Sequence, residues 1–139
     1  MSWDVMIFKF AGEPPRTVGE IKNANRIPLG TAEEVRASIS RILGAVDWTD
    51  PTWGTYEGDG FSIEFNVGRK DPIEHAALHV HGGGDAVSAI MALVRALGWS
   101  AIDGSTDEFL DPAAPCDAGW KGFQAFRDQV SRRAQKRDA

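Results

Sequence analysis

The chain has 139 residues, of which 42% are hydrophobic and 25% charged. This length is typical of one domain, and the composition excludes disorder, collagen or coiled coil over the whole chain. The formal net charge is −5, with an acidic excess in residues 1–110 and a basic excess in residues 111–139. Because phosphate binding needs clustered Lys and Arg, nucleic acid is disfavoured as a partner. We predict a single domain over residues 1–139.

The sequence also argues against a membrane or an oxidising compartment. No run of residues approaches the ~20 apolar positions of a membrane span. The N-terminal segment carries Asp4 where a signal peptide carries positive charge. Cys116 is the only cysteine, which excludes an intramolecular disulfide, and it has no evident base partner for catalysis. We expect a soluble, cytoplasmic protein without a cofactor and without a membrane partner.

The first half of the chain predicts a strand, a loop and a helix. Residues 3–10 alternate with apolar side chains on both faces, which predicts a strand in the interior of a sheet. Residues 13–30 are polar and rich in turn formers, which predicts a long loop. A helix over residues 31–43 follows, because Thr31 and Glu34 match a capping box ahead of an apolar stripe.

Turn signals and alternating patterns dominate the middle of the chain. Residues 47–54 are typical of a turn-rich connector. Three strands of an antiparallel meander are then expected, over 53–57, 61–67 and 73–81.

The last third predicts two helices and one strand. A helix over 85–97 leads to a strand over 99–103, which residues 106–110 extend past a turn. Because this helix links the strand 73–81 to the strand 99–103, the two strands are expected to be parallel through a crossover. The final helix spans about residues 118–135, with a basic, frayed end at residues 136–139.

These elements predict an α+β fold, a two-layer sandwich in the order βαβββαβα. It has one antiparallel-rich, mixed sheet of about five strands, with two helices on one face and a C-terminal helix. The C-terminal helix is expected to cover part of the helix-free face beside the strand 3–10. The predicted core consists of Val5, Ile7, Phe8, Val35, Ile39, Ile63, Phe65, Leu78, Val80, Ile90, Val94 and Leu97.

Polar side chains of two predicted strands form the first candidate site. His79 and His81 are two positions apart on a strand, so they point to the same side. Glu64 and Asn66 point outward from the preceding strand. We expect these four side chains to floor a shallow groove, although a solvated face without a role remains an open interpretation. A zinc site needs three or four ligands, and because the spacing does not supply them we predict no metal.

Three glycines, Gly82, Gly83 and Gly84, lie between a predicted strand and a predicted helix, at one end of the groove. Glycine backbone at a helix N-terminus suits an anion, but the segment matches no phosphate-binding motif. Asp85 follows, and its carboxylate is expected to occupy the N-terminal amides itself. A tight turn and a binding loop both remain open.

Two tryptophans, Trp48 and Trp53, are expected on a loop rim among the acids Asp47, Asp50 and Glu57. Tryptophan is frequent at the energetic centres of interfaces. The pair is therefore either a partner surface or a lid over the edge of the core.

Five segments resemble a family of small bacterial proteins without an assigned activity. They are MSWDV at 1–5, DWTDPTWG at 47–54, SIEFN at 62–66, HVHGGGD at 79–85, and GW at 98–99 with DGSTDEFLD at 103–111. The resemblance covers about residues 1–130 and implies a bacterial source and a cytoplasmic location. It supplies no catalytic residue.

Two functions remain as hypotheses. The first is a non-enzymatic protein-binding module that engages another protein through the Trp rim or the polar sheet face. A bacterial immunity protein that neutralises a basic toxin would fit the size and the negative charge. The alternative is a small-molecule binder or enzyme that uses His79, His81 and Glu64 in the sheet-face groove. The first is favoured, because no complete catalytic constellation is present and no catalytic residue can be named.

Overall fold

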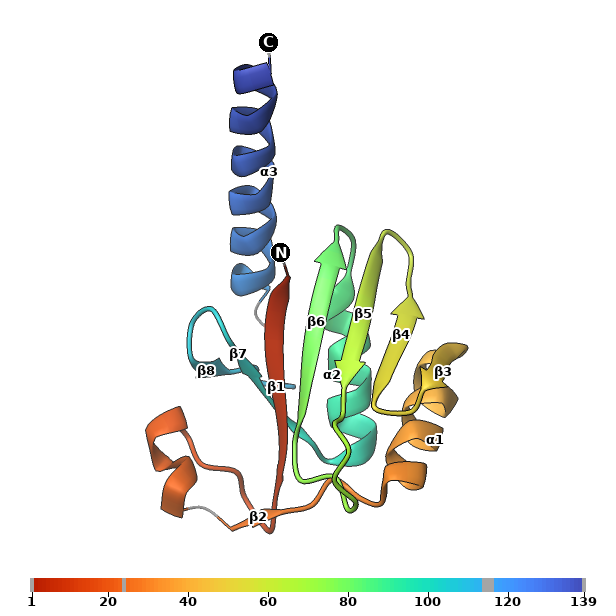
Figure 1. Cartoon of the computed structure of the whole chain (residues 1–139). Helices are drawn as coiled ribbons and strands as arrows, with labels where there is room; N and C mark the ends of the chain where they lie inside the picture. Colours follow the sequence, from red (N-terminus) through yellow and green to blue (C-terminus); the bar gives the residue numbers. More distant parts are fainter. Residues whose placement is uncertain (1, 24, 114–116, 139) are drawn as a thin grey trace.

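An antiparallel sheet organises the chain, which the computed structural model describes over residues 2–23, 25–113 and 117–138. The sheet has eight strands in the order β3-β4-β5-β6-β1-β7-β8, with β2 paired to β1 (Figure 1). The strands are β1 (Trp3–Phe10), β2 (Arg26–Ile27), β3 (Val46–Asp50), β4 (Trp53–Glu57), β5 (Phe61–Asn66), β6 (Ala76–Gly82), β7 (Ser100–Asp103) and β8 (Glu108–Phe109). The helices are η1 (Val18–Asn23), α1 (Ala32–Leu43), α2 (Ala86–Leu97) and α3 (Ala118–Asp138).

Strand β1 lies in the interior of the sheet, as its two apolar faces predict. It pairs antiparallel with β6 on one side and with β7 on the other. β6 and β7 therefore run in the same direction, as predicted, but β1 separates them, so they are not direct neighbours. The described strand pairings are all antiparallel.

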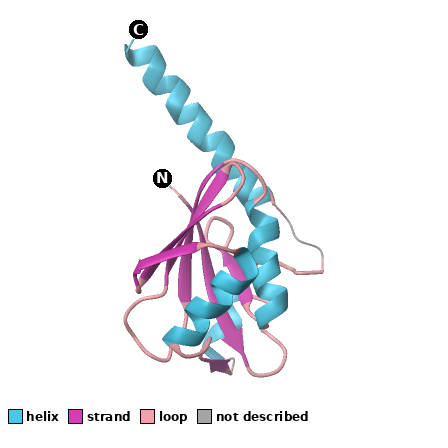
Figure 2. Ribbon diagram, turned by 90° about the vertical axis from the view of Figure 1, so that its right-hand side faces the viewer, coloured by secondary structure: helices cyan, strands magenta, loops and turns pink. Residues whose placement is uncertain are grey.

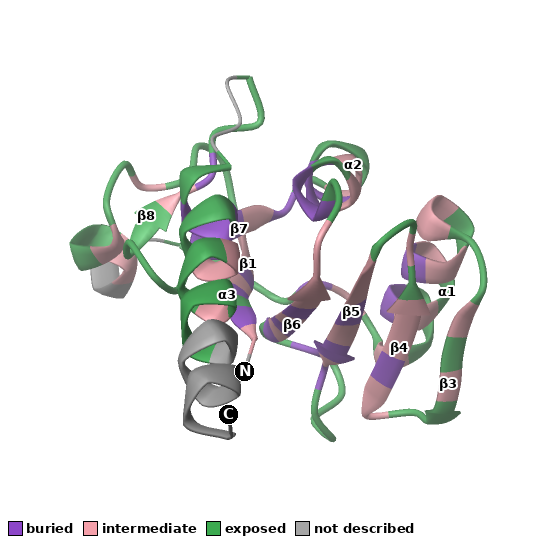
Figure 3. Cartoon of the chain, turned by 90° about the horizontal axis from the view of Figure 1, so that it is seen from above, coloured by how far each residue is buried: buried purple, intermediate pink, exposed green. Residues whose placement is uncertain are grey.

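Helices α1 and α2 cover one face of the sheet and leave the other face without a helix (Figures 2 and 3). Both begin at the predicted caps. The Thr31 hydroxyl accepts from the Glu34 amide, and the Asp85 carboxylate accepts from the Ser88 amide. Ten of the twelve predicted core residues are buried between the helices and the sheet. Leu97 is only partly buried, at the rim of this core.

Phe8 is the error in the predicted core. It points to the helix-free face, where it is only partly buried. Its ring contacts Phe10 and His75, and the guanidinium of Arg26 lies 5.6 Å from its centroid. β1 is apolar on both faces because one face meets the helices while the other carries a smaller aromatic cluster.

The strand count and order differ from the prediction of about five strands. The expected connector 47–54 contains most of the edge strand β3, and the expected loop 13–30 contains η1 and β2. β3 has only one neighbour, β4, and its register shifts between Asp47 and Asp50. A short, polar edge strand of this kind lacks the apolar alternation by which strands are recognised in a sequence.

The prediction that the C-terminal helix covers part of the helix-free face differs from the structure. Helix α3 begins at the N-terminal end of β1 and projects beyond the sheet, leaning to the side of the helix-free face (Figures 1 and 2). Its first turns are fixed by Trp120, which is buried and lies 5.6 Å from the Trp3 ring. Trp120 is therefore buried at the end of the sheet and not over the helix-free face. Within the described ranges, no helix has both the length and the apolar character that a membrane crossing needs.

Candidate functional site

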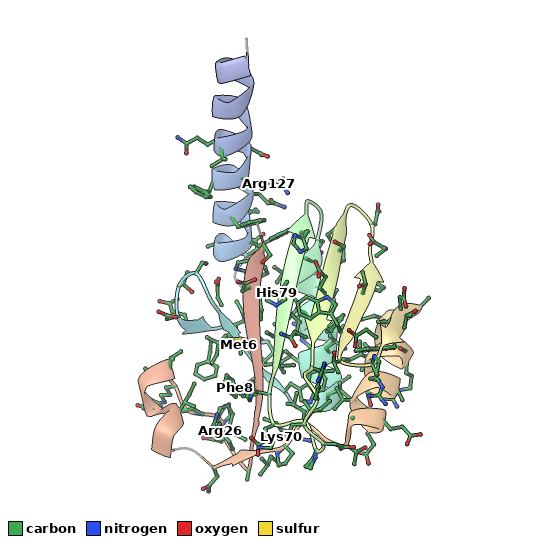
Figure 4. All side chains as sticks on the ribbon, viewed as in Figure 1. Met6, Phe8, Arg26, Lys70, His79 and Arg127 are labelled. Carbon is green, nitrogen blue, oxygen red and sulfur yellow. The ribbon has the colours of Figure 1, made fainter. Side chains whose placement is uncertain are left out.

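The helix-free surface of β4, β5, β6 and β1, here called the open face, carries a row of polar residues. The strand register aligns Thr55, Glu64, His79 and Asp4 across the four strands. Opposed residues of antiparallel strands point to the same side, so their side chains share one surface. Figure 4 shows His79 on this face beside Met6 and Phe8.

Side-chain contacts connect this row into a network across the sheet. The His79 Nδ1 donates to Asp4 Oδ1 over 2.7 Å, and His81 Nε2 lies 2.7 Å from Glu64 Oε1. The Trp53 indole N–H donates to Glu64 Oε2 over 2.8 Å. The Trp53 ring also stacks on the imidazole of His79, with centroids 5.4 Å apart. Each histidine of the pair is therefore held by one carboxylate.

The carboxylate of Asp4 is stabilised in its charged form. Burial alone would raise the pKa of Asp4, but hydrogen bonds from Ser2 and His79 and the charges of His79 and His81 outweigh it. The pKa of Asp4 is therefore lowered from its ordinary value of 3.8. Asp4 is ionised at neutral pH and gives the open face a fixed negative charge.

Asn66 completes the predicted set on the open face. Register places it between Trp53 of β4 and Ala77 of β6. The structure thus brings together Glu64, Asn66, His79 and His81, the four residues expected to floor a groove.

The two tryptophans of the predicted rim lie on opposite sides of the sheet. Trp48 belongs to β3 and packs over Gly54, where a Cβ would lie 2.5 Å from its ring. Its indole N–H donates to the Ser40 hydroxyl of α1 over 3.0 Å. Trp48 therefore fastens α1 to the sheet edge, whereas Trp53 belongs to the open face. The expected Trp rim is not one surface.

The glycine segment packs against the turn between β4 and β5. The Gly83 amide donates to the Gly60 carbonyl over 2.7 Å, and a Cβ on Gly84 would lie 2.5 Å from the Asp59 carbonyl oxygen. Gly84 also has a φ of 78°, which disfavours other residues. Close approach therefore explains Gly84, and also Gly82, where a Cβ would lie 2.7 Å from the Gly60 carbonyl oxygen, whereas a Cβ on Gly83 would meet only ordinary contacts.

The same segment also receives α3. The Gly84 carbonyl accepts from the Trp120 indole N–H over 2.8 Å, and the Gly82 carbonyl accepts from the Arg127 guanidinium. Carbonyl oxygens face this side of the loop, and Asp85 caps α2, so the loop acts as a docking point for α3. This use was not evident from the sequence.

A buried carboxylate fixes the other side of α3. Asp103 is 2% exposed and accepts from the Trp3 indole N–H over 2.9 Å and from the Ser105 amide over 2.8 Å. A Cβ on Gly119 of α3 would lie 1.8 Å from Asp103 Oδ2, so the helix meets this carboxylate through bare backbone. Asp103 is therefore a structural anchor.

A cleft of about 470 Å³ lies in the corner between α3 and the N-terminal end of β1. We call it the corner cleft, and its lining includes Ser2, Asp4, Thr106, Gly122, Phe123 and Phe126. Asp4 also belongs to the open-face network, so the two features are continuous. Sequence reasoning missed this cleft because it depends on the direction in which α3 leaves the sheet.

The arrangement offers acidic and aromatic groups on one side of the molecule. Over residues 2–23, 25–113 and 117–138, no group of three or more His, Cys, Asp or Glu side chains is placed to hold a metal ion. A scan of family models and searches of curated proteins and solved structures returned no match.

Proposed function

We propose that the chain is a protein-binding module whose partner docks on the open face and on the adjoining side of α3. The observation that carries this proposal is the uncovered apolar surface of α3. Phe126 is 55% exposed and Val130 is 40% exposed, on a helix that extends beyond the sheet (Figure 1). Helices of globular proteins gain most of their stability from packing, so an outlying helix with exposed aromatic surface favours a partner.

The charge of the chain indicates the kind of partner. The formal net charge is −5, and the open face presents the carboxylates of Asp4 and Glu64. Complementary charge steers association and disfavours wrong partners. We therefore propose a partner that presents basic side chains to the open face, as a toxin-neutralising immunity protein would require.

The test begins with capture of a partner by the full chain from an extract of its native host, followed by mass spectrometry. The affinity of the recombinant partner is then measured for the wild type and for Glu64→Lys. We expect Glu64→Lys to weaken binding by about tenfold or more, because it reverses charge at the centre of the interface. Glu33→Lys is the matched control, since Glu33 is exposed on α1 at the opposite side of the sheet.

Equal weakening by both substitutions would show that only the total charge matters. Such a result, or retention of full affinity by Glu64→Lys, would contradict the proposed interface.

The pair Asp4 and His79 favours a second candidate function, a small-molecule binder or enzyme. A carboxylate on Nδ1 orients an imidazole so that Nε2 can act as a general base. Among the described residues, the hydrogen bonds of His79 go to Asp4 alone, so no protein nucleophile completes the arrangement. Thermal stabilisation of the wild type by a metabolite, lost in His79→Gln, would favour this candidate over the first.

A further inference from the structure

We infer that the corner cleft receives an arginine side chain of the partner. This inference rests on the proposed function and names the group that the partner contributes. The cleft lies where the open face meets α3, so a partner that contacts both surfaces must pass over it. Its volume of about 470 Å³ is sufficient for a long side chain.

The walls of the cleft suit the aliphatic chain and the planar guanidinium group of an arginine side chain. Phe123 and Phe126 form one wall. The guanidinium of Arg127 already lies 5.9 Å from the centroid of the Phe123 ring, so an arginine–phenylalanine pair is present in this part of the fold, as it is at Arg26 and Phe8. Phe126, which is largely exposed, presents its ring to an incoming side chain. Arginine stacks on aromatic faces and is less strongly hydrated than lysine.

Asp4 supplies the opposite charge. Its hydrogen bonds from Ser2, over 2.5 Å, and from His79, over 2.7 Å, both end at Oδ1. The Asp4 side chain is 52% exposed, and within the described residues its Oδ2 is left for a further donor. The hydroxyls of Ser2 and Thr106, which also line the cleft, can accept further guanidinium N–H groups.

The helical wall leaves room for this side chain because Gly122 has no Cβ. A Cβ built at Gly122 would have no neighbouring heavy atom within 4 Å, so the position opens directly into the cleft. A larger side chain there would enter the space without disturbing the packing of α3. Gly122→Leu therefore blocks the cleft, and Ala125→Leu adds bulk to an exposed position that does not line it.

The inference can be tested without the partner. The full chain, labelled with ¹⁵N, is titrated with Nα-acetyl-arginine N-methylamide and followed by backbone amide shifts. We expect saturable shifts, with a millimolar dissociation constant, at Thr106, Gly122 and Phe126. The shifts should vanish in Gly122→Leu and persist in Ala125→Leu. Asp4→Asn should weaken binding about three- to tenfold, because it removes a charge-assisted hydrogen bond.

Titrations with the corresponding citrulline, lysine and leucine analogues show which property of arginine the cleft recognises. Citrulline has the shape of arginine without its charge, and it should bind at least about threefold more weakly. Equal binding by citrulline or leucine would overturn the role of Asp4, and equal binding by lysine would overturn the role of the planar group. Absence of saturable shifts with the arginine analogue would overturn the inference as a whole.

The identified partner separates this inference from the proposed function. Gly122→Leu should weaken its affinity by about tenfold or more, as expected for loss of an anchor. If Glu64→Lys abolishes partner binding while Gly122→Leu leaves it intact, the arginine inference fails and the proposed interface stands. If neither substitution affects partner binding, the proposed interface fails as well.

Discussion

Two glycines of α3 show how single residues position this helix. Gly119 meets the buried Asp103 carboxylate, where a Cβ would lie 1.8 Å from Oδ2, whereas Gly122 faces open space. The first glycine is required for close approach and the second is not. The same residue type therefore has opposite consequences at two positions of one helix.

Gly119→Ala and Gly122→Ala form a matched pair of substitutions. We expect Gly119→Ala to lower the free energy of unfolding by about 1–3 kcal/mol, because the added methyl group displaces α3 or Asp103. Gly122→Ala should raise it by up to about 1 kcal/mol, because alanine favours the helix. Urea unfolding measures both. A stabilising effect of Gly119→Ala would show that α3 does not pack on Asp103.

The cap of α2 gives a pH-dependent prediction. Hydrogen bonds from the Ser88 hydroxyl and amide outweigh the small effect of burial and lower the pKa of Asp85 from its ordinary value of 3.8. A carboxylate of this kind stabilises the fold above its unfolded pKa, and the contribution is lost as the pH falls through the folded pKa. Asp85→Ala should therefore cost about 1 kcal/mol at pH 7, and less below about pH 4.

Asp85→Asn is the control for this cap. Asparagine caps helices about as well as aspartate, so its cost at pH 7 should be smaller than that of alanine. Unfolding free energies of the three proteins at pH 7 and pH 3 test the prediction. A cost of Asp85→Ala that does not decrease in acid would mean that the charged form contributes nothing.

At the scale of elements, the helices and the central strands follow from local patterns. Thr31 and Asp85 act as caps because their side chains satisfy amides within one turn, which is a local property. The alternation of apolar and polar residues in β5, which places one face of the strand in the core, is also a local property of the sequence. β3 and the direction of α3 depend on contacts distant in sequence, such as Trp48 with Ser40 and Trp120 with Gly84. The periodicity of apolar residues along the sequence does not predict these contacts.

The same limit holds for the candidate site: its local patterns were predictable, and its contacts between distant parts of the sequence were not. Glu64, Asn66, His79 and His81 share a face because alternation fixes the side of each strand and a meander makes the strands neighbours. Asp4 escaped prediction because it reaches His79 only when β1 lies beside β6, a pairing between residues 75 positions apart. The corner cleft needs the position of α3 in addition.

The burial of Phe65 tests the assignment of the two faces of β5. Phe65 is fully buried between the sheet and the helices and touches Trp48. Phe65→Ala should lower the free energy of unfolding by about 3–5 kcal/mol, because it leaves a cavity in the core. Phe126→Ala removes the same ring from an exposed position and should change stability by less than about 0.5 kcal/mol. Comparable losses in chemical unfolding would contradict the described packing of α3.

At the scale of the whole molecule, the hydrophobic core and the proposed binding surface are separated in space. The core lies mainly between the sheet and the helices α1 and α2 and includes Trp120 of α3, whereas the open face, the corner cleft and the exposed part of α3 lie outside it. The two faces of β1 connect the regions, because Trp3 and Val5 belong to the core side while Asp4 and Met6 belong to the open face. Substitutions on the open face can therefore test the proposed interface without removing the core.

This separation predicts a pattern of amide hydrogen exchange. The amides of β1 and β6 should exchange most slowly, because both strands are paired on two sides and cover the core. The outer turns of α3, beyond Val130, should exchange rapidly in the free chain, because an outlying helix opens without disrupting the core. Binding of the partner should slow exchange in α3 and leave β1 unchanged. The measurement is made at a concentration where sedimentation shows a monomer. If the outer turns are then as protected from exchange as β1, the result contradicts the proposal that a partner docks on α3.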